Sequence, residues 1–249
     1  MTPRLILCCI QVPTDALLEI DAASILRHFP DVELRLYKLP LLSTTFDTTS
    51  RSFRLYATLI KEAVMALVLP HERYAKNIIV GLACTSMSFM LGATYVDTLI
   101  HEVYPCLLCT DMARAQYMAV KSVGMTRISM LTPYTEDISR NNADMICQVP
   151  GVSIIEHMML GIVHDHLTSS ITPEEIEHYI KQIDTPVSNG ILIGCSAFRV
   201  CGSGFIDALE QAYEDKPVVT STQAFLWHML RQGGITDQIT GYGRLLREH

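Results

Sequence analysis

The stretch NIIVGLACTSMSFMLG, residues 77–92, joins an apolar, β-branched segment to a helix-like pattern through a cysteine and two hydroxyl residues. Its first part is apolar over 78–83, which is typical of a buried strand. After Cys84 the apolar residues recur at helical spacing. The stretch therefore predicts a strand, a turn that carries Cys84, and a helix, which together are the repeating unit of an α/β fold.

The rest of the chain repeats this alternation. Strand candidates occupy 4–12, 32–38, 77–83, 105–109, 126–132, 152–156, 189–194 and 217–220. Helix-like stretches lie at 15–28, 51–68, 86–103, 111–123, 135–146, 172–183, 203–214 and 222–233. Because strands separated by helices must be joined by crossovers, this order predicts an α/β fold with parallel strands and helices on both faces.

The helix expected at 172–183 has the clearest start. In SSITPEEI, Thr172 suits the N-cap, Pro173 suits the first turn, and Glu175 follows three residues after the cap. This combination is a capping box with proline at the first helical position.

A weak internal repeat indicates two lobes. LILCCIQVPTDALLEI at 5–20 resembles RISMLTPYTEDISRNN at 127–142, and IIVGLACTS at 78–86 resembles ILIGCSA at 191–197. Two copies of one half-sized unit would place a proline turn and a cysteine turn at the carboxyl ends of strands in each lobe. Ligands of open α/β sheets bind at those ends. The alternative is that any two α/β segments look alike at this level.

Composition excludes several classes of protein. The chain has 249 residues, 49% of them hydrophobic, and a net charge of -7. Its 19 Lys and Arg residues are scattered, so nucleic acid is not expected as a partner. No apolar run approaches the ~20 residues that span a bilayer, and the apolar start fits a first strand better than a signal peptide. We expect a protein without a membrane partner.

The eight cysteines show no disulfide-framework spacing, which fits a reducing cytosol and predicts a cytoplasmic protein. A single C-x-x-C has no second pair, so no structural metal is expected. Apolar surroundings predict core or near-core positions for Cys8, Cys9, Cys106, Cys109 and Cys147.

Four segments occur in order along nearly the whole chain: ACTSMS around Cys84, LTPY ending at Tyr134, IGCS at Cys195, and PVVTSTQAFLWHMLRQGGI at 217–235. In these segments the chain resembles the aspartate/glutamate racemase superfamily, and most closely its maleate cis-trans isomerase branch. The resemblance implies two pseudo-symmetric, Rossmann-like lobes with parallel sheets and an active site in the cleft between them. It also implies no cofactor, and two opposed cysteines acting on a small carboxylate or dicarboxylate.

The repeat and the segment at 217–235 predict how the chain divides. Residues 1–110 and 222–249 form the N-terminal lobe, and 111–221 form the C-terminal lobe. Whether the protein forms a homo-oligomer is left open.

A reactive role for Cys84 and Cys195 has a physical basis. A cysteine at a strand-to-helix turn lies beside helical N–H groups, which favour the thiolate and lower the pKa. Such N–H groups, with the hydroxyls of Thr85, Ser86 and Ser196, could bind a carboxylate without Arg or Lys. The alternative is that the cysteines are packed small residues and the hydroxyls are N-caps.

Two further hydroxyl groups are candidates for substrate binding. Tyr134 follows a proline at a strand end, and the resemblance gives it a contact with the substrate carboxylate. Its counterpart in the first half is Thr14. Each could instead be an ordinary strand-end residue.

The chain departs from the isomerase branch at three polar positions. An Asn expected after the first proline is replaced by Thr14 and Asp15, and a second Asn by Asp165 and His166. After the second cysteine, Ser196-Ala197 stands where the branch usually has Thr-Asn. Asp15 would repel a dicarboxylate or act only as a helix N-cap, whereas a protonated His166 would attract an anion, so we include His166 among the substrate-binding residues.

We predict a cofactor-independent isomerase in which Cys84 adds to a double bond and Cys195 handles the proton. The first alternative is an aspartate/glutamate-type racemase with one thiol on each face. An arylmalonate-type decarboxylase needs only the second cysteine, so the presence of Cys84 argues against it. A non-catalytic carboxylate sensor is the last alternative.

Overall fold

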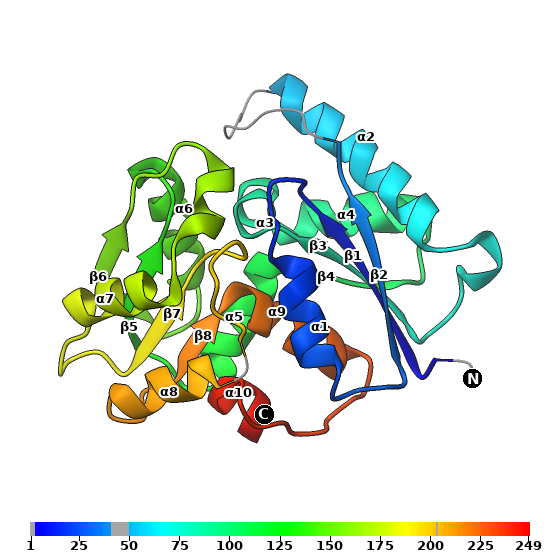
Figure 1. Cartoon of the computed structure of the whole chain (residues 1–249). Helices are drawn as coiled ribbons and strands as arrows, with labels where there is room; N and C mark the ends of the chain where they lie inside the picture. The colour runs from blue at the N-terminus through cyan, green and yellow to red at the C-terminus, as the bar shows by residue number, and fades with distance from the viewer. Residues whose placement is uncertain (1–2, 41–49, 203) are drawn as a thin grey trace.

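The computed structural model describes residues 3–40, 50–202 and 204–249. It contains two four-stranded parallel sheets surrounded by helices (Figure 1), so the predicted two-sheet α/β fold is confirmed. The first sheet has the order β2-β1-β3-β4, from β1 (Leu5–Gln11), β2 (Val32–Lys38), β3 (Ile78–Ala83) and β4 (Leu108–Asp111). The second has the order β6-β5-β7-β8, from β5 (Arg127–Thr132), β6 (Ser153–Met159), β7 (Gly190–Ile193) and β8 (Val218–Thr220).

The two sheets share one strand order, since in each the first strand lies between the second and the third. This equivalence gives the internal repeat a structural meaning. β1 corresponds to β5 and β3 to β7, so Cys84 and Cys195 follow equivalent strands.

The helices alternate with these strands as expected. They are α1 (Leu18–Leu26), α2 (Ser50–Leu67), α3 (Thr85–Leu91), α4 (Ala93–Val103), α5 (Met112–Ser122), α6 (Glu136–Ile146), α7 (Pro173–Ile183), α8 (Phe205–Ala212), α9 (Ser221–Gln232) and α10 (Gly243–Glu248). Two short 3₁₀ helices are η1 (Pro70–Glu72) and η2 (Asp165–Ser170). At α7 the expected capping box is present: the Thr172 hydroxyl accepts from the amide of Glu175 at 3.2 Å, and the Glu175 carboxylate accepts from the amide of Thr172 at 2.8 Å.

Three boundaries differ from the prediction. The single helix expected at 86–103 is two helices, because Gly92 adopts φ +83° and ends the first of them. The helix expected from 203 begins at Phe205, and Ser203 lies outside the described residues. The six-residue α10 was not predicted, since it is too short to show a periodic pattern.

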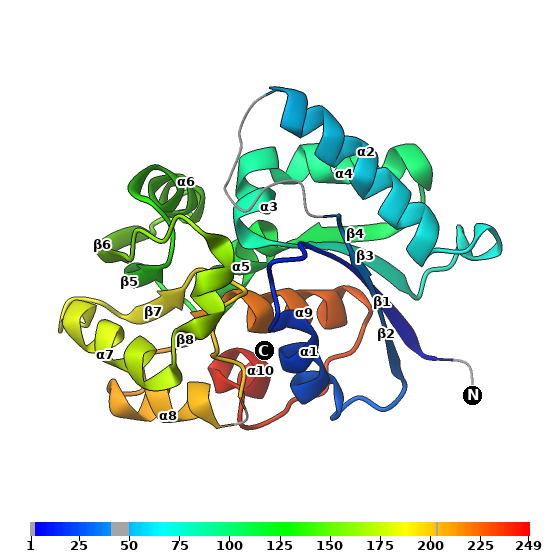
Figure 2. The same ribbon diagram turned by 45° about the horizontal axis from the view of Figure 1, so that its top comes forward.

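β1 shows how the first sheet is covered on both faces. One set of its side chains packs into a core with α1 and α9: Leu5, Leu7 and Cys9. The alternate set packs into a second core with α2 and α4: Ile6, Cys8 and Ile10. This period of two is what a central parallel strand requires, and Figure 2 shows the helices on either side of the sheet.

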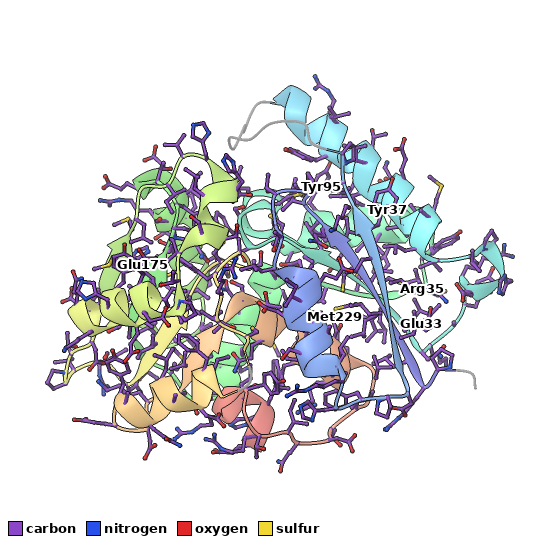
Figure 3. The ribbon with its side chains drawn as sticks, in the orientation of Figure 1. Glu33, Arg35, Tyr37, Tyr95, Glu175 and Met229 are labelled. Carbon is purple, nitrogen blue, oxygen red and sulfur yellow. The ribbon has the colours of Figure 1, made fainter. Side chains whose placement is uncertain are left out.

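Helices α5 and α9 lie side by side between the two sheets (Figures 1 and 2). The Gln116 amide of α5 donates to the Ser221 hydroxyl of α9 at 2.8 Å. α9 also packs closely on β3, because a Cβ at Gly81 would lie 2.4 Å from the Phe225 ring. Met229 of α9, labelled in Figure 3, brings its sulfur within 3.9 Å of the Cys9 sulfur on β1.

The division into 1–110 with 222–249, and 111–221, stays a prediction. α9 packs against β3, β4 and α1 on one side and against β8 and α5 on the other, while α10 packs against α8, α9 and β8. One hydrophobic core runs through both sheets.

Two of the cysteine predictions are wrong. Cys106 and Cys147 are exposed, because each lies at the end of its apolar run, in a turn. Cys8, Cys9 and Cys109 are buried as expected. Within the described part of the chain, no helix is long and apolar enough to cross a membrane.

Candidate active site

Cys84 lies where β3 passes into α3, at the N-cap position of that helix. Its side chain is 5% exposed, and the Ser86 hydroxyl lies 3.5 Å from its sulfur. Burial raises the pKa of this thiol to about 12, and the negative charge of Asp165 acts in the same direction. The Ser86 hydroxyl and the amide of Met87 oppose the rise. The helix start therefore favours the thiolate as expected, but burial outweighs it.

Cys195 follows β7 at the equivalent place in the second sheet, but no helix begins there. The chain runs through a loop to α8, ten residues further on, so the helical N–H groups expected beside Cys195 are missing. The amide of Ala197 donates to the Cys195 sulfur at 3.4 Å. Burial raises the pKa of Cys195 well above its usual value, Asp165 raises it further, and a hydrogen bond with Tyr134 lowers it.

Tyr134 connects the two cysteines. It follows β5 and is 2% exposed, and its ring meets Phe89 of α3 edge-on, with 6.2 Å between centroids. Burial raises the pKa of the Tyr134 hydroxyl, and the charges of both cysteines and of Asp165 act in the same direction. The structure thus brings the two thiols and this phenol into one buried cluster.

Asp165, the first residue of η2, brings a carboxyl group to the same cluster. Its Oδ2 accepts a hydrogen bond from the hydroxyl of Thr14, which lies in the loop after β1. Since η2 follows β6 of the second sheet and Thr14 follows a strand of the first, this bond joins the two halves of the molecule. Burial raises the pKa of Asp165, the Thr14 hydroxyl lowers it, and the charge of Asp15 raises it.

Asp15 has both roles that the sequence left open. Its Oδ1 accepts from the amides of Leu17 and Leu18 at 2.9 and 3.0 Å, which caps the start of α1. It is also 2% exposed and close enough to raise the pKa of both Cys84 and Cys195. Burial raises the pKa of Asp15 itself, while a hydrogen bond with the Ser196 side chain opposes the rise.

The remaining residues that were predicted to bind substrate differ in their contacts and in their exposure to solvent. Ser86 and Ser196 contact Cys84 and Asp15 respectively, as described. The Thr85 hydroxyl is buried and lies 3.5 Å from the sulfur of Met112. His166 is exposed, with its ring 6.0 Å from that of His164, and its charge acts on Asp165. Asp165, and not His166, is near enough to the thiols for its charge to act on both of them.

Within the described part of the chain, Cys84, Cys195 and Tyr134 are nearly inaccessible to solvent, whereas Thr14 and Asp165 are partly exposed. A hollow of about 610 Å³ lies elsewhere, among α3, α4, α5 and α6, and its lining includes Phe89, Arg114 and Asn141 but neither site cysteine. Because neither thiol is exposed, we expect the two halves to move apart when substrate binds.

A family model described as arylmalonate decarboxylase matches residues 50–246, which is most of the chain. The chain belongs to the arylmalonate decarboxylase family. The resemblance to the aspartate/glutamate racemase superfamily is thereby confirmed. Over 197 residues, this family member is 27% identical to the arylmalonate decarboxylase of Bordetella bronchiseptica, an alignment that covers 75% of this chain and 80% of that protein.

Solved structures with the same fold include isomerases and decarboxylases. A variant of Nocardia farcinica maleate cis-trans isomerase with a covalently bound succinylcysteine intermediate aligns with a TM-score of 0.81 at 14% identity, over 98% of this chain and 99% of that one. A double variant of arylmalonate decarboxylase in its liganded form aligns with a TM-score of 0.78 at 22% identity, over 98% and 100%. At these identities the likenesses show that this arylmalonate decarboxylase family member shares its fold with enzymes of both kinds.

Asp21 of α1 carries a buried carboxyl group. This group lies beside the cluster, next to Cys201 and Asp15. Burial raises the pKa of Asp21 to about 7, Asp15 raises it further, and Cys201 and Arg199 lower it. The usual pKa of an aspartate is about 4. Folding therefore takes up a proton between these values, so the stability contributed by this site is greatest below pH ~4 and falls as pH rises to ~7.

We therefore expect Asp21→Asn to leave stability nearly unchanged at pH 4 and to raise it at pH 8. The upper limit of the gain is about 4 kcal/mol, or roughly 10 °C in Tm. Thermal melts of both proteins at the two pH values measure it. Asp137→Asn, on the exposed face of α6, is the control for removing one charge. Equal shifts at pH 4 and pH 8 would contradict the prediction.

Proposed function

We propose that the protein is a cofactor-independent isomerase of a small carboxylate, with Cys84 and Cys195 as the two reacting groups. The observation that supports this most directly is that equivalent strands of the two sheets deliver a thiol each to one buried cluster around Tyr134. Two thiols that converge on one substrate can attack and protonate neighbouring carbon atoms.

The first chemical step is the addition of Cys84 to the double bond. When the two halves separate, contact with water weakens the burial that keeps this thiol protonated, and its proton passes to solvent. The sulfur then forms a bond to one alkene carbon while the π electrons move to the neighbouring carbon. That carbon takes a proton from Cys195, which leaves a single bond between the two carbons.

The second step is rotation followed by elimination. The new single bond rotates, and the Cys195 thiolate removes the proton that it gave. The electron pair of that C–H bond re-forms the double bond as the carbon–sulfur bond breaks, so Cys84 leaves as thiolate and the product is trans. The covalent succinylcysteine in the maleate cis-trans isomerase of the same fold supports this route.

Decarboxylation is the second candidate function, because the matching family model and the Bordetella bronchiseptica relative are both arylmalonate decarboxylases. In that reaction carbon dioxide leaves the substrate and one cysteine protonates the remaining carbanion. Cys84 would then have no chemical role, although it lies in the cluster. Racemisation of an acidic amino acid uses both thiols, one on each face of the α-carbon.

A panel of substrates followed by proton NMR in deuterated water separates these reactions. Maleate and its monoamide, maleamate, test isomerisation; phenylmalonate tests decarboxylation; single enantiomers of aspartate and glutamate test racemisation. We expect trans products from the cis-alkene acids. Conversion of phenylmalonate to phenylacetate without any trans product would establish the decarboxylase instead. Deuterium at the α-carbon of an amino acid, with loss of optical rotation, would establish the racemase.

A further inference from the structure

Two carboxyl groups lie at the same carboxyl edges of the sheets as the site sulfurs. Asp15 follows β1 and Cys84 follows the neighbouring β3, while Asp165 and Cys195 follow β6 and β7 of the second sheet. Asp165 and Asp15 are, in that order, the charges that most raise the pKa of Cys84 and of Cys195. Each carboxyl is fixed in place, Asp165 by the Thr14 hydroxyl and Asp15 by the amides at the start of α1. Among the described residues, the side chains at the reacting centre are therefore thiols, hydroxyls and acids.

Among the side chains that the structure describes, the cations that act on these acids lie outside the cluster. Lys38 acts on Asp15 and His166 acts on Asp165, and both side chains are exposed to solvent. Lys38 is also shared with Glu19, whose carboxylate lies 3.5 Å away. Solvent screens such charges, so they offset little of the negative potential at the thiols.

A substrate with two carboxylates would have to place at least one of them near Asp165 or Asp15. Two like charges a few ångströms apart in a largely buried site repel each other strongly. A carboxamide or another uncharged group of the same size has no such cost, and it can donate hydrogen bonds to a carboxylate.

We propose that Asp165, held by Thr14 and flanked by Asp15, makes this site selective for a substrate with one carboxylate and an uncharged polar group in place of a second. This inference rests on the proposed isomerase function and names the substrate class for it. Asp165 is then a specificity-determining residue, because its charge would act on the end of the substrate that differs between a diacid and its monoamide.

Maleate and maleamate differ only in that end group, so the ratio of their kcat/KM values tests the inference. The wild-type protein should prefer maleamate, at a pH where maleate is a dianion. Asp165→Asn keeps an oxygen that can accept from Thr14 but removes the charge. It should shift the ratio toward maleate by roughly 10- to 100-fold.

Asp111→Asn is the matched control. Asp111 is also buried, burial raises its pKa to about 6, and it caps α5 by accepting from the amide of Arg114 at 2.8 Å. The ratio should not change in this variant. Should Asp165→Asn fail to fold, Asp15→Asn, which can still accept from the α1 amides, should shift the ratio in the same direction.

Three results would overturn the inference. An equal rate with both substrates in the wild-type protein, unchanged in Asp165→Asn, would show that the charge does not select. A loss of maleate turnover in Asp165→Asn would show that a protonated Asp165 donates a hydrogen bond to the second carboxylate. If no variant isomerises either substrate, the isomerase proposal itself fails, and the inference fails with it.

Discussion

Replacing Cys84 by alanine is expected to abolish isomerisation and to prevent any covalent adduct with a cis-alkene acid. The reaction proposed here begins with a bond from the Cys84 sulfur to carbon, and a methyl group cannot form it. Ser86, whose hydroxyl lies 3.5 Å from that sulfur, is a far weaker nucleophile and cannot replace it. The measurement is turnover by proton NMR together with intact-protein mass spectrometry after incubation with substrate.

Cys8→Ala is the matched control for this variant. Cys8 is a buried free cysteine of β1 that packs in the same hydrophobic core as Cys84, and its thiol contacts the backbone oxygen of Leu67 at 3.8 Å. Its loss should cost some stability and leave turnover intact. Full activity of Cys84→Ala would return Cys84 to a packing role, and an adduct on Cys195 in that variant would reverse the assignment of the two thiols.

The order of strands and helices could be predicted from the sequence because the signals for it are local. Apolar runs such as 78–83 and amphipathic periods such as 172–183 depend on near neighbours, and the structure has elements at both places. The break at Gly92 could not be placed with the same rule. A glycine inside a helical pattern is tolerated in many helices, and only the positive φ at this position ends α3.

The site could be predicted less completely, for a different physical reason. The turn at Cys84 and the tyrosine after β5 follow from the order of elements, and both reach the cluster. The pKa values of the thiols do not follow from the order of strands and helices. A helix start lowers a thiol pKa and can be seen in the sequence, whereas burial by the other half of the molecule raises it and cannot.

The sequence also could not show whether Asp165 or His166 lies at the site. The two residues are adjacent and the expected Asn position covers both, so sequence alone does not decide which side chain points inward. The structure decides it through Thr14, whose hydroxyl bonds to Asp165 from a loop about 150 residues away in the chain. Contacts of this range leave no periodic signal in the sequence.

Cys195→Ala is expected to behave differently from Cys84→Ala. Cys84 can still attack the substrate, but the carbanion that forms has lost the thiol that protonates it. Turnover should fall by ~10²–10⁴-fold, as is typical when a general acid or base is removed, while an adduct on Cys84 accumulates. The proton must then come from water, which is a weaker acid than the thiol.

Cys195→Ser separates a chemical role of this thiol from a packing role. Serine nearly restores the size of the side chain, and its hydroxyl can accept the hydrogen bond that the amide of Ala197 gives to the sulfur. A hydroxyl is nevertheless a much weaker acid than a thiol, so turnover should stay close to that of the alanine variant. Recovery of wild-type turnover with serine would mean that Cys195 only fills space beside Tyr134. Unchanged decarboxylation of phenylmalonate in Cys84→Ala, with loss of that activity in Cys195→Ser, would instead assign the second thiol to the decarboxylase reaction.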